Sequence, residues 1–502
     1  MSALRIHIAA ALAVAAALRL FRLGHQSLWV DEVFSWMSAD IGHRWSWSHL
    51  LEDVHGPLYS LMLHLWGGIA GDSEWALRLP SAVLGVALVG AIAWVAALWL
   101  GRETAVPAAW LAAGSPFLVW YAQEARNYTA LMLWVCVGSA LLLGLARRLA
   151  PARVAGYVAA AGIGVLSNLS FAMMAPVHLR WWLGPAGGRL RRLALAGGVA
   201  VLVLAIAAAW VPQIARIWDW KRLDPAHHAA AAETPLRGAT TFHAAAIPFA
   251  AYTFAVGPTL GPPVRALRVS AGLATLRPWA LELAVSAVVF GLLIALGFAA
   301  VRRRDRLGDA LLWLVLPALV VSYFAMQNFK VFHPRYLAVS VPAFIALLAA
   351  AFADLGRSRR VALAALVAAL WTVSLTRLYF DPRFAREDMR GAARWVAARA
   401  MAGDRIVAAN TAELLVYYYR GPVPVTPYWL GYAADARLAP RFEAAAGEAP
   451  SVWVVLSRAE DFDRAGAFAR YLDQRYPAAE RATFEGVRVW HIRRTPPSPA
   501  HT

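Results

Sequence analysis

The sequence predicts a predominantly α-helical polytopic membrane protein that carries a small C-terminal soluble α/β domain. Of its 502 residues, 60% are hydrophobic and 23 are tryptophan. The mean hydropathy of +0.52 lies outside the range of soluble globular proteins. Long apolar runs continue to Arg377, and the composition becomes mixed after Asp381. We therefore expect a membrane domain over residues 1–378, a soluble domain over 379–495 and a disordered tail over 496–502.

A helix needs roughly 20 apolar residues to cross a bilayer, and about eleven transmembrane segments meet or approach that length. They lie near residues 4–21, 77–99, 104–120, 129–146, 153–169, 171–187, 194–211, 279–301, 309–327, 336–354 and 361–377. The first run has no small-residue cleavage signal behind it, which predicts a retained span.

The formal net charge of +18 does not indicate nucleic-acid binding, because most positive residues are arginines in short clusters between apolar runs. With a cytoplasmic N-terminus, these clusters fall on the cytoplasmic side, as the positive-inside rule requires. They are Arg147-Arg148 with Arg153, Arg180 with Arg189, Arg191 and Arg192, Arg302-Arg303-Arg304 with Arg306, and Arg357 with Arg359-Arg360. The outer side then receives loops 22–76 and 212–278, turns 121–128 and 328–335, and the C-terminal domain. The single cysteine, Cys136, excludes an internal disulfide.

Two adjacent carboxylates, Asp31 and Glu32, lie between aromatic residues in the first outer loop. Ionised groups at this depth are costly and frequently mark functional sites. If the segment is helical, Asp31 shares a polar stripe with Ser35 and Ser38 and faces the interior of the membrane domain, about 100° round the helix from Glu32. The alternative is that Asp31 merely caps a short interfacial helix, although Phe34 stands where a capping box has Glu or Gln.

Two further regions have interpretable periodicity. Residues 57–70 are apolar but too short to span, which predicts a juxtamembrane or re-entrant helix whose stripe contains Tyr59, Leu63 and Trp66. In the C-terminal domain, the pattern predicts helices and strands in alternation. The helices are expected at 383–401 and 464–475, and the strands at 405–409, 451–456 and 483–492.

Five short motifs stand in order at the predicted outer edge of the membrane domain. They are Asp31-Glu32, His55-Gly56-Pro57-Leu58-Tyr59, Ala76-Leu77-Arg78-Leu79-Pro80-Ser81, Gln123-Glu124-Ala125-Arg126-Asn127-Tyr128 and His333-Pro334-Arg335-Tyr336-Leu337. Together they resemble the bacterial family 39-like glycosyltransferases of the GT-C superfamily, which also includes protein O-mannosyltransferases and the aminoarabinose transferases that modify lipid A. Weaker matches of the same kind are Gly261-Pro262-Pro263-Val264-Arg265 and Arg386-Glu387-Asp388-Met389-Arg390. The sequence departs from the family pattern at Gly56, where a second proline is more usual, and at Ser167-Asn168-Leu169, where many relatives carry a histidine-containing stretch.

This resemblance implies a GT-C-like fold and an inverting glycosyltransferase of the bacterial plasma membrane. Its donor would be a polyprenyl-phosphate sugar, and its acceptor an envelope lipid, glycan or protein on the extracytoplasmic face. Inversion by direct displacement needs a base for the acceptor's proton and positive charge for the departing phosphate. The resemblance implies Asp31 as the base, Glu32 as a group that orients the acceptor or binds a metal, and Glu124 as a second catalytic carboxylate. Family members differ in their use of a divalent metal, and the sequence leaves this open.

Arg335 is the first choice for the donor phosphate, because a guanidinium group binds phosphate bidentately. Lys330 and His333 add positive charge beside it, and Tyr336 follows. The alternative is a basic anchor for lipid headgroups.

The remaining candidates for substrate binding come from the two earlier motifs. Arg126, followed by Tyr128, contacts phosphate or forms a local ion pair with Glu124. His55 and Tyr59 line the acceptor path, unless the histidine is simply a buried, satisfied one. Arg78 is more consistent with a structural or headgroup-facing role.

The rival class is a transporter or flippase of lipid-linked sugars, which would show polar or broken spans near mid-bilayer. Here the ionisable residues gather at the outer edge, and the span cores are mostly Ala, Leu and Val, which favours surface chemistry. Trp45-Ser46-Trp47 and Trp218-Asp219-Trp220 suit sugar stacking or an interfacial aromatic belt. His227-His228 lacks partners in a metal-binding pattern and is interpreted as loop.

Overall fold

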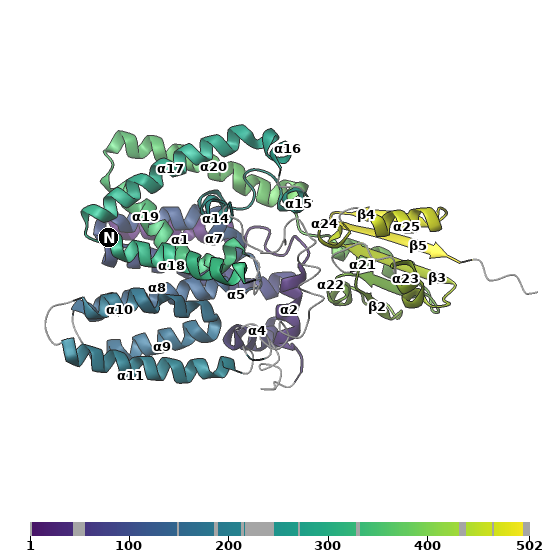
Figure 1. Ribbon diagram of the computed structural model, residues 1–502, viewed down its shortest axis with the longest axis horizontal. Helices are drawn as coiled ribbons and strands as arrows, with labels where there is room; N and C mark the ends of the chain where they lie inside the picture. The colour runs from purple at the N-terminus through teal and green to yellow at the C-terminus, as the bar shows by residue number, and fades with distance from the viewer. Residues whose placement is uncertain are drawn as a thin grey trace, which may run out of the picture.

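The computed structural model describes most of the chain and shows a helical body with a smaller α/β domain at one end (Figure 1). The described residues are 3–43, 56–147, 150–184, 189–211, 215, 245–269, 272–327, 332–430, 438–463 and 466–494. The fold is therefore a mostly helical polytopic membrane protein with a small C-terminal mixed sheet.

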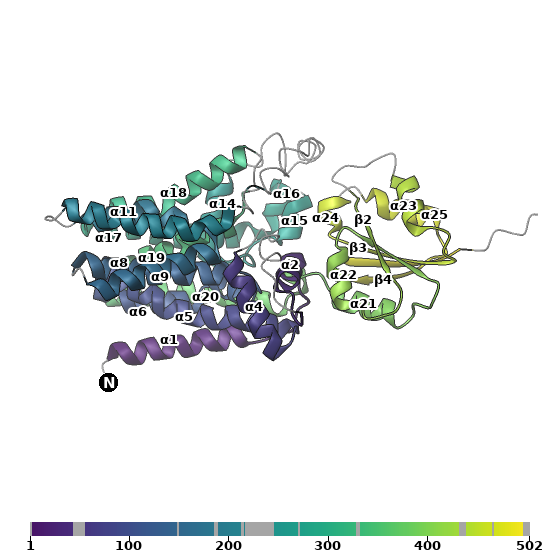
Figure 2. The same cartoon turned by 90° about the horizontal axis from the view of Figure 1, so that it is seen from below.

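The helical body consists of long helices that run along the longest axis of the molecule (Figures 1 and 2). Its helices are α1 (Ala3–Leu20), α5 (Glu74–Leu100), α6 (Ala105–Gly114), α7 (Pro116–Ala122), α8 (Tyr128–Arg147), α9 (Pro151–Ser167), α10 (Ala175–Leu183), α11 (Arg189–Ala207), α17 (Ala280–Arg303), α18 (Leu307–Met326), α19 (Val341–Asp354) and α20 (Arg357–Phe380). Helix α19 is buried from Val341 to Phe352, because small and apolar side chains surround it on every side.

The expected count of eleven spans is not confirmed. Among the described residues, seven helices are long and apolar enough to cross a membrane, or eight if α6 and α7, which are bent by 57°, form one broken span. Shorter apolar helices cover Pro151–Ser167, Leu195–Ala207 and Ala246–Val256. The span expected near 171–187 is a 3-10 helix, η2 (Leu169–Met174), followed by the nine-residue α10. Pro176 explains this break, because proline removes a backbone donor and is tolerated only in the first turn of an α-helix.

The turn after α17, which carries Arg304, lies at the end of the body away from the α/β domain (Figure 1). Arg304 donates to the Leu100 carbonyl at 2.9 Å, to Glu103 at 3.1 Å and to Asp354 at 2.6 Å. It therefore ties the ends of α5, α17 and α19 together.

The opposite end of the body, nearer the α/β domain, carries the short helices (Figure 1). They are α2 (Val30–Ala39), α4 (Pro57–Ala70), α14 (Ala246–Val256), α15 (Val264–Val269) and α16 (Leu273–Leu276). Helix α4 has the bounds that the sequence predicts, and Tyr59 and Leu63 of its stripe are buried against Ala39 and Ala130.

The C-terminal domain is a five-stranded mixed sheet in the order β2-β1-β3-β5-β4. Its strands are β1 (Arg405–Ala409), β2 (Val425–Tyr428), β3 (Ser451–Ser457), β4 (Glu480–Phe484) and β5 (Val487–Arg493). β1 pairs in parallel with β2 and β3, whereas β5 runs antiparallel to β3 and β4. Side chains alternate between two cores. One face is covered by α21 (Met389–Ala397) and α22 (Ala412–Tyr418), and the other by α23 (Leu438–Ala446) and α25 (Ala467–Arg475), while α24 (Ala459–Phe462) follows β3.

Two predictions for this domain need correction. The single strand expected at 483–492 is a hairpin, because Gly486 adopts a φ of 67° and turns β4 back into β5. The helix expected at 383–401 is limited to α21, since the Asp388 side chain accepts a hydrogen bond from Gly391 N at 2.9 Å and starts the helix there. β2 was not predicted at all, because Pro427 interrupts a short edge strand.

The two positions at which the sequence departs from the family pattern meet in space. A Cβ atom on Gly56 would lie 2.0 Å from the Ser167 carbonyl oxygen. The same oxygen accepts a hydrogen bond from Asn127 Nδ2 at 2.8 Å, so it cannot move freely. A side chain at residue 56 therefore does not fit against the end of α9.

We predict that Gly56→Ala lowers the melting temperature of the purified protein, because overpacking of this kind costs about 1–3 kcal/mol. Gly68→Ala is the matched control, since a Cβ there meets no atom of the described residues within 4 Å and alanine favours the helix. Equal melting temperatures for the two variants would contradict the close packing of Gly56 on Ser167.

Candidate active site

Helix α2 presents the two adjacent carboxylates to different surroundings. Trp29 precedes its first residue, and Glu32 Oε2 accepts a hydrogen bond from the Trp29 backbone N–H at 3.2 Å. The helix therefore begins at Val30 with Glu32 as the capping carboxylate, and Asp31 lies within the first turn. The interpretation of Asp31 as an N-cap is wrong.

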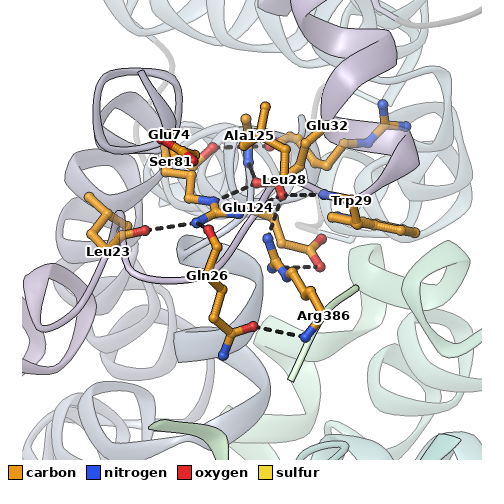
Figure 3. A network of polar contacts seen from close by, with 12 residues as sticks. Leu23, Gln26, Leu28, Trp29, Glu32, Glu74, Ser81, Glu124, Ala125 and Arg386 are labelled. Atoms are coloured by element: carbon orange, nitrogen blue, oxygen red, sulfur yellow. Dashed lines mark hydrogen bonds and ion pairs between the residues drawn. The ribbon is translucent and has the colours of Figure 1, made fainter. Parts of the chain in front are cut away.

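Glu32 is buried completely and is bonded on both oxygens (Figure 3). Arg78 forms a bidentate ion pair with it: Nε donates to Oε1 and Nη2 donates to Oε2, both at 2.8 Å. Ala125 N donates to Oε1 at 2.9 Å, and Arg386 Nη1 forms an ion pair with Oε2. Burial alone would raise the pKa of Glu32, but the charges of Arg386 and Arg78 lower it to about 2. Glu32 is therefore ionised at neutral pH. Its ion pairs and hydrogen bonds connect α2, α5, the 124–126 turn and the segment leading into the C-terminal domain.

Arg78 has a structural role, as the sequence suggested. Besides Glu32, its guanidinium donates to the carbonyls of Leu23, Gln26 and Ser27, each at 2.9 Å. These bonds fix the loop that leads into α2. Each guanidinium nitrogen of Arg78 therefore donates to a group of the protein itself.

Asp31 pairs with Arg335, which lies 304 positions away in the sequence. Arg335 Nη1 donates to Asp31 Oδ2 at 2.7 Å, and both side chains remain about one-fifth exposed, at 17% and 20%. Arg335 belongs to the 3-10 helix η5 (Pro334–Ser340), where the His333 ring accepts a hydrogen bond from its backbone N–H at 3.2 Å. Its guanidinium lies over the rings of Trp29 and Tyr336, 5.4 and 5.2 Å from their centroids. His333 and Tyr336 therefore hold Arg335 in place.

Arg126 bonds to α2 and not to Glu124. Its Nη1 donates to the Asp31 carbonyl at 2.9 Å and to Ser35 Oγ at 3.0 Å, while its buried Nε finds no hydrogen-bond partner in the described part of the chain. The alternative of a local Glu124–Arg126 ion pair is therefore wrong. Arg126 reinforces the polar face of α2 on which Asp31 stands.

Glu124 is the third carboxylate of the site and the least compensated one. Its Oε1 pairs with Arg386 Nη2 at 3.3 Å, and no described residue forms a hydrogen bond with its buried Oε2. Burial raises the pKa of Glu124 to about 7, against the charge of Arg386 and with a contribution from Glu32. The charges of Arg335 and Asp31 also act on this carboxyl, so all three groups belong to one cluster. A carboxyl with such a pKa exchanges protons at neutral pH.

The other predicted residues support the cluster or lie outside the described residues. The Tyr59 hydroxyl contacts Ser81 Oγ at 2.7 Å, and Ser81 Oγ donates to the Arg126 carbonyl at 3.2 Å. Tyr128 is buried below Arg126, 5.9 Å from the guanidinium. The residues outside the described ranges are His55, Lys330, Trp45-Ser46-Trp47, Trp218-Asp219-Trp220 and His227-His228.

Arg386 is the site residue that the sequence analysis did not select. It bridges Glu32 and Glu124, and its backbone N–H donates to Gln26 Oε1 at 3.2 Å (Figure 3). Its guanidinium lies 5.6 Å from the Trp120 ring centroid. The available signal was the weak motif Arg386-Glu387-Asp388-Met389-Arg390, which stands where the last span leads into the C-terminal domain.

The arrangement of donors around the carboxylates does not suit a divalent cation. Among the described residues, no three His, Cys, Asp or Glu side chains converge on one point. Glu32 is saturated by guanidinium and backbone donors, and Asp31 and Glu124 each face an arginine. A metal ion would have to displace these guanidinium groups, so the three carboxylates are poorly suited to bind one.

Residues 54–212 match the family model described as dolichyl-phosphate-mannose-protein mannosyltransferase. No curated protein sequence matches the chain. This match and the shared fold confirm the resemblance to GT-C membrane glycosyltransferases that is predicted from the sequence.

Several solved structures share this fold along nearly the whole chain. ArnT from Cupriavidus metallidurans in the apo state has a TM-score of 0.57 at 15% identity, with 98% of each chain covered. The same protein bound to undecaprenyl phosphate gives 0.55 at 16% identity, over 96% of this chain and 97% of that chain. The Archaeoglobus fulgidus oligosaccharyltransferase tethered with an acceptor peptide gives 0.55 at 13% identity, over 96% of this chain and 73% of that chain.

We predict that Glu32→Gln strongly destabilises the protein, because loss of one partner from a buried ion pair typically costs about 3–5 kcal/mol. Since the pKa of Glu32 is lowered from 4.5 to about 2, its stabilisation is fully present above pH 4.5 and is lost as the pH falls towards 2. Thermal unfolding of the purified protein from pH 7 to pH 3 measures both effects. Glu103→Gln, at a half-exposed ion pair with Arg304, is the control and should change little. A melting temperature for Glu32→Gln equal to that of the control would contradict the central role of Glu32.

Proposed function

We propose that the protein is an integral-membrane inverting glycosyltransferase that moves a sugar from a polyprenyl-phosphate donor to an envelope acceptor on the extracytoplasmic face. The observation that carries this proposal is the pairing of Asp31 with Arg335 beside the buried Glu124. A candidate base and a candidate phosphate ligand from distant parts of the chain thus meet at one edge of the membrane domain. The GT-C fold, a relative solved with undecaprenyl phosphate and the match to a dolichyl-phosphate-mannose family support the same donor class.

The charge of the site favours an anionic ligand. Arg126, Arg335 and Arg386 bring three guanidinium groups around Asp31 and Glu124, and Glu124 is only partly ionised at neutral pH. Among the residues that the structure describes, the buried Nε atoms of Arg126 and Arg335 have no hydrogen-bond partner. A donor phosphate would supply the missing acceptors, and arginine is well suited to it because its fork matches two phosphate oxygens.

In the proposed reaction, Asp31 takes the proton of the acceptor hydroxyl as that oxygen attacks the anomeric carbon. The bond from this carbon to the phosphate oxygen breaks, and the electron pair leaves with the phosphate, which Arg335 neutralises. Attack from the side opposite the leaving group inverts the anomeric configuration. In the resting state Arg335 shares its charge with Asp31. A bound phosphate competes for that charge, so Asp31 becomes a stronger base once the donor is in place.

Glu124 has a different part in this scheme. A developing oxocarbenium ion is stabilised by a nearby carboxylate, as in glycoside hydrolysis. Because the pKa of Glu124 is about 7, the negative charge is present only in the upper part of the neutral range. Because their surroundings differ, Asp31 can serve as the proton acceptor while Glu124 stabilises the developing positive charge.

The proposed orientation follows from the distribution of arginine. Basic turns such as that around Arg304 lie at the end of the helical body away from α2 and the C-terminal domain. By the positive-inside rule that end faces the cytoplasm. The site and the C-terminal domain would then face outwards, at the level where the phosphate of a lipid carrier sits.

Asp31→Asn is expected to reduce transfer by about 10²–10⁴-fold, because the amide cannot accept the acceptor's proton. The assay incubates the purified protein with a panel of polyprenyl-phosphate sugars and envelope extract, and counts sugar in the acceptor. Asp40→Asn is the matched control, since Asp40 ends the same helix with a φ of 46°, a conformation that asparagine tolerates. A wild-type rate of transfer by Asp31→Asn would exclude Asp31 as the base. Movement of lipid-linked sugar across the membrane of sealed vesicles, without transfer to an acceptor, would favour the alternative function of a flippase.

The rate of transfer is expected to rise with pH through an inflection near 7, as Glu124 loses its proton. Glu124→Gln should abolish this inflection and lower the maximal rate. Arg386→Gln should move it to higher pH, because the charge of Arg386 opposes the burial that raises the pKa of Glu124. The measurement is the pH–rate profile of the three proteins, with melting temperatures to verify folding. An unchanged inflection in Glu124→Gln would assign the titration to another group.

A further inference from the structure

A pocket with polar and apolar walls lies beside the active site and shares Arg386 with it. Its enclosed part is small, and it opens to solvent between the ends of α1, α7 and α20. Its polar lining consists of Arg22, His25, Gln26, Arg78, Gln123 and Arg386, while Trp120, Leu378 and Tyr379 supply apolar walls. We refer to it as the Arg22 pocket.

The lining of the Arg22 pocket has positive charge and no carboxylate. Arg78 and Arg386 turn their guanidinium groups towards Glu32 and Glu124, which lie outside the pocket. Within the described part of the chain, Arg22 has no carboxylate partner, and its contacts are the His25 ring and the Phe380 ring, 4.9 Å from the centroid. An uncompensated cation at the wall of a small pocket favours an anionic ligand.

The backbone and the neighbouring histidine hold Arg22 in this position. Arg22 adopts a φ of 54°, a left-handed conformation that is unfavourable for a residue with a side chain. Burial, followed by the charges of Arg22 and Arg390, lowers the pKa of His25. The His25 ring is therefore neutral at pH 7 and leaves the charge of Arg22 intact. The helix end below is closed by Gln123, which donates to the Phe21 carbonyl at 2.8 Å.

Exposed apolar side chains stand next to the pocket residues in the sequence. Leu20 and Phe21 at the end of α1 are 43% and 47% exposed, and Phe380 at the end of α20 is 58% exposed. Aromatic residues at span ends are typical of the membrane interface, where lipid phosphates reside. We propose that the Arg22 pocket binds a phosphate group, carried by an anionic membrane lipid, at a site separate from the Asp31–Arg335 pair. This inference concerns binding alone and does not depend on the proposed transfer reaction.

The test counts the lipid molecules that stay bound to the purified full-length protein by native mass spectrometry. Phosphatidylglycerol, phosphatidylcholine and inorganic phosphate are the three probes. We expect the wild-type protein to retain phosphatidylglycerol in preference to phosphatidylcholine, and Arg22→Gln to bind it about tenfold more weakly, the usual effect of losing one charged hydrogen bond. Displacement of phosphatidylglycerol by inorganic phosphate would show that phosphate itself is recognised, and failure to displace it would assign the site to the lipid form.

Two further variants make the result decisive. His25→Glu places a carboxylate at an exposed position of the pocket mouth, where folding is not at stake, and should weaken retention as well. Arg302→Gln removes the same charge from an exposed site at the other end of the helical body and should leave retention unchanged. Equal retention by wild type, Arg22→Gln and His25→Glu, or an equal loss in Arg302→Gln, would overturn the proposal, as would indifference between the two lipids.

Discussion

The outer face of this protein depends on the buried anion of Glu32. An isolated carboxylate in such a place is very unfavourable, and it persists only when every oxygen is paired. Here the partners come from α5, from the turn before α8 and from the segment that leads into the C-terminal domain. Satisfying one charge therefore requires that four parts of the chain assemble together. The membrane domain and the soluble domain consequently meet at a defined place, and α2 is oriented with Asp31 towards Arg335.

Much of this arrangement was predictable from the sequence, because helix periodicity and the alternation of spans determine which motifs share an edge. The bounds of α4 and β1 and the face of α2 that bears Asp31 follow from such patterns, whereas the family resemblance suggested Asp31 and Arg335 as residues of one site. The division of roles between Asp31 and Glu32 was not predictable. Neighbouring residues on a helix differ by about 100° in direction, and only tertiary packing determines which of them meets Arg78.

Arg386 illustrates a second limit of the sequence. It is one of 48 basic residues, and it lies 354 positions from Glu32 and 262 from Glu124. No local period marks a residue whose function comes from long-range contacts in an irregular segment. For the same reason the hairpin at Gly486 and the break at Pro176 were missed. Both depend on how single residues redirect the backbone, while the average hydrophobic pattern continues through them.

The balance of charges distinguishes the candidate active site around Asp31 and Glu124 from the Glu32 network that supports it. Glu32 absorbs the charge of Arg78 and part of that of Arg386, so its surroundings are balanced without a ligand. Around Asp31 and Glu124, the remaining charge of Arg386 adds to that of Arg126 and Arg335, and the partial protonation of Glu124 leaves the cluster with a positive excess. A balanced site gains little from a ligand, whereas one with excess positive charge is stabilised by an anion. The imbalance therefore separates the part of the network that holds the fold from the part suited to bind a phosphate-linked substrate.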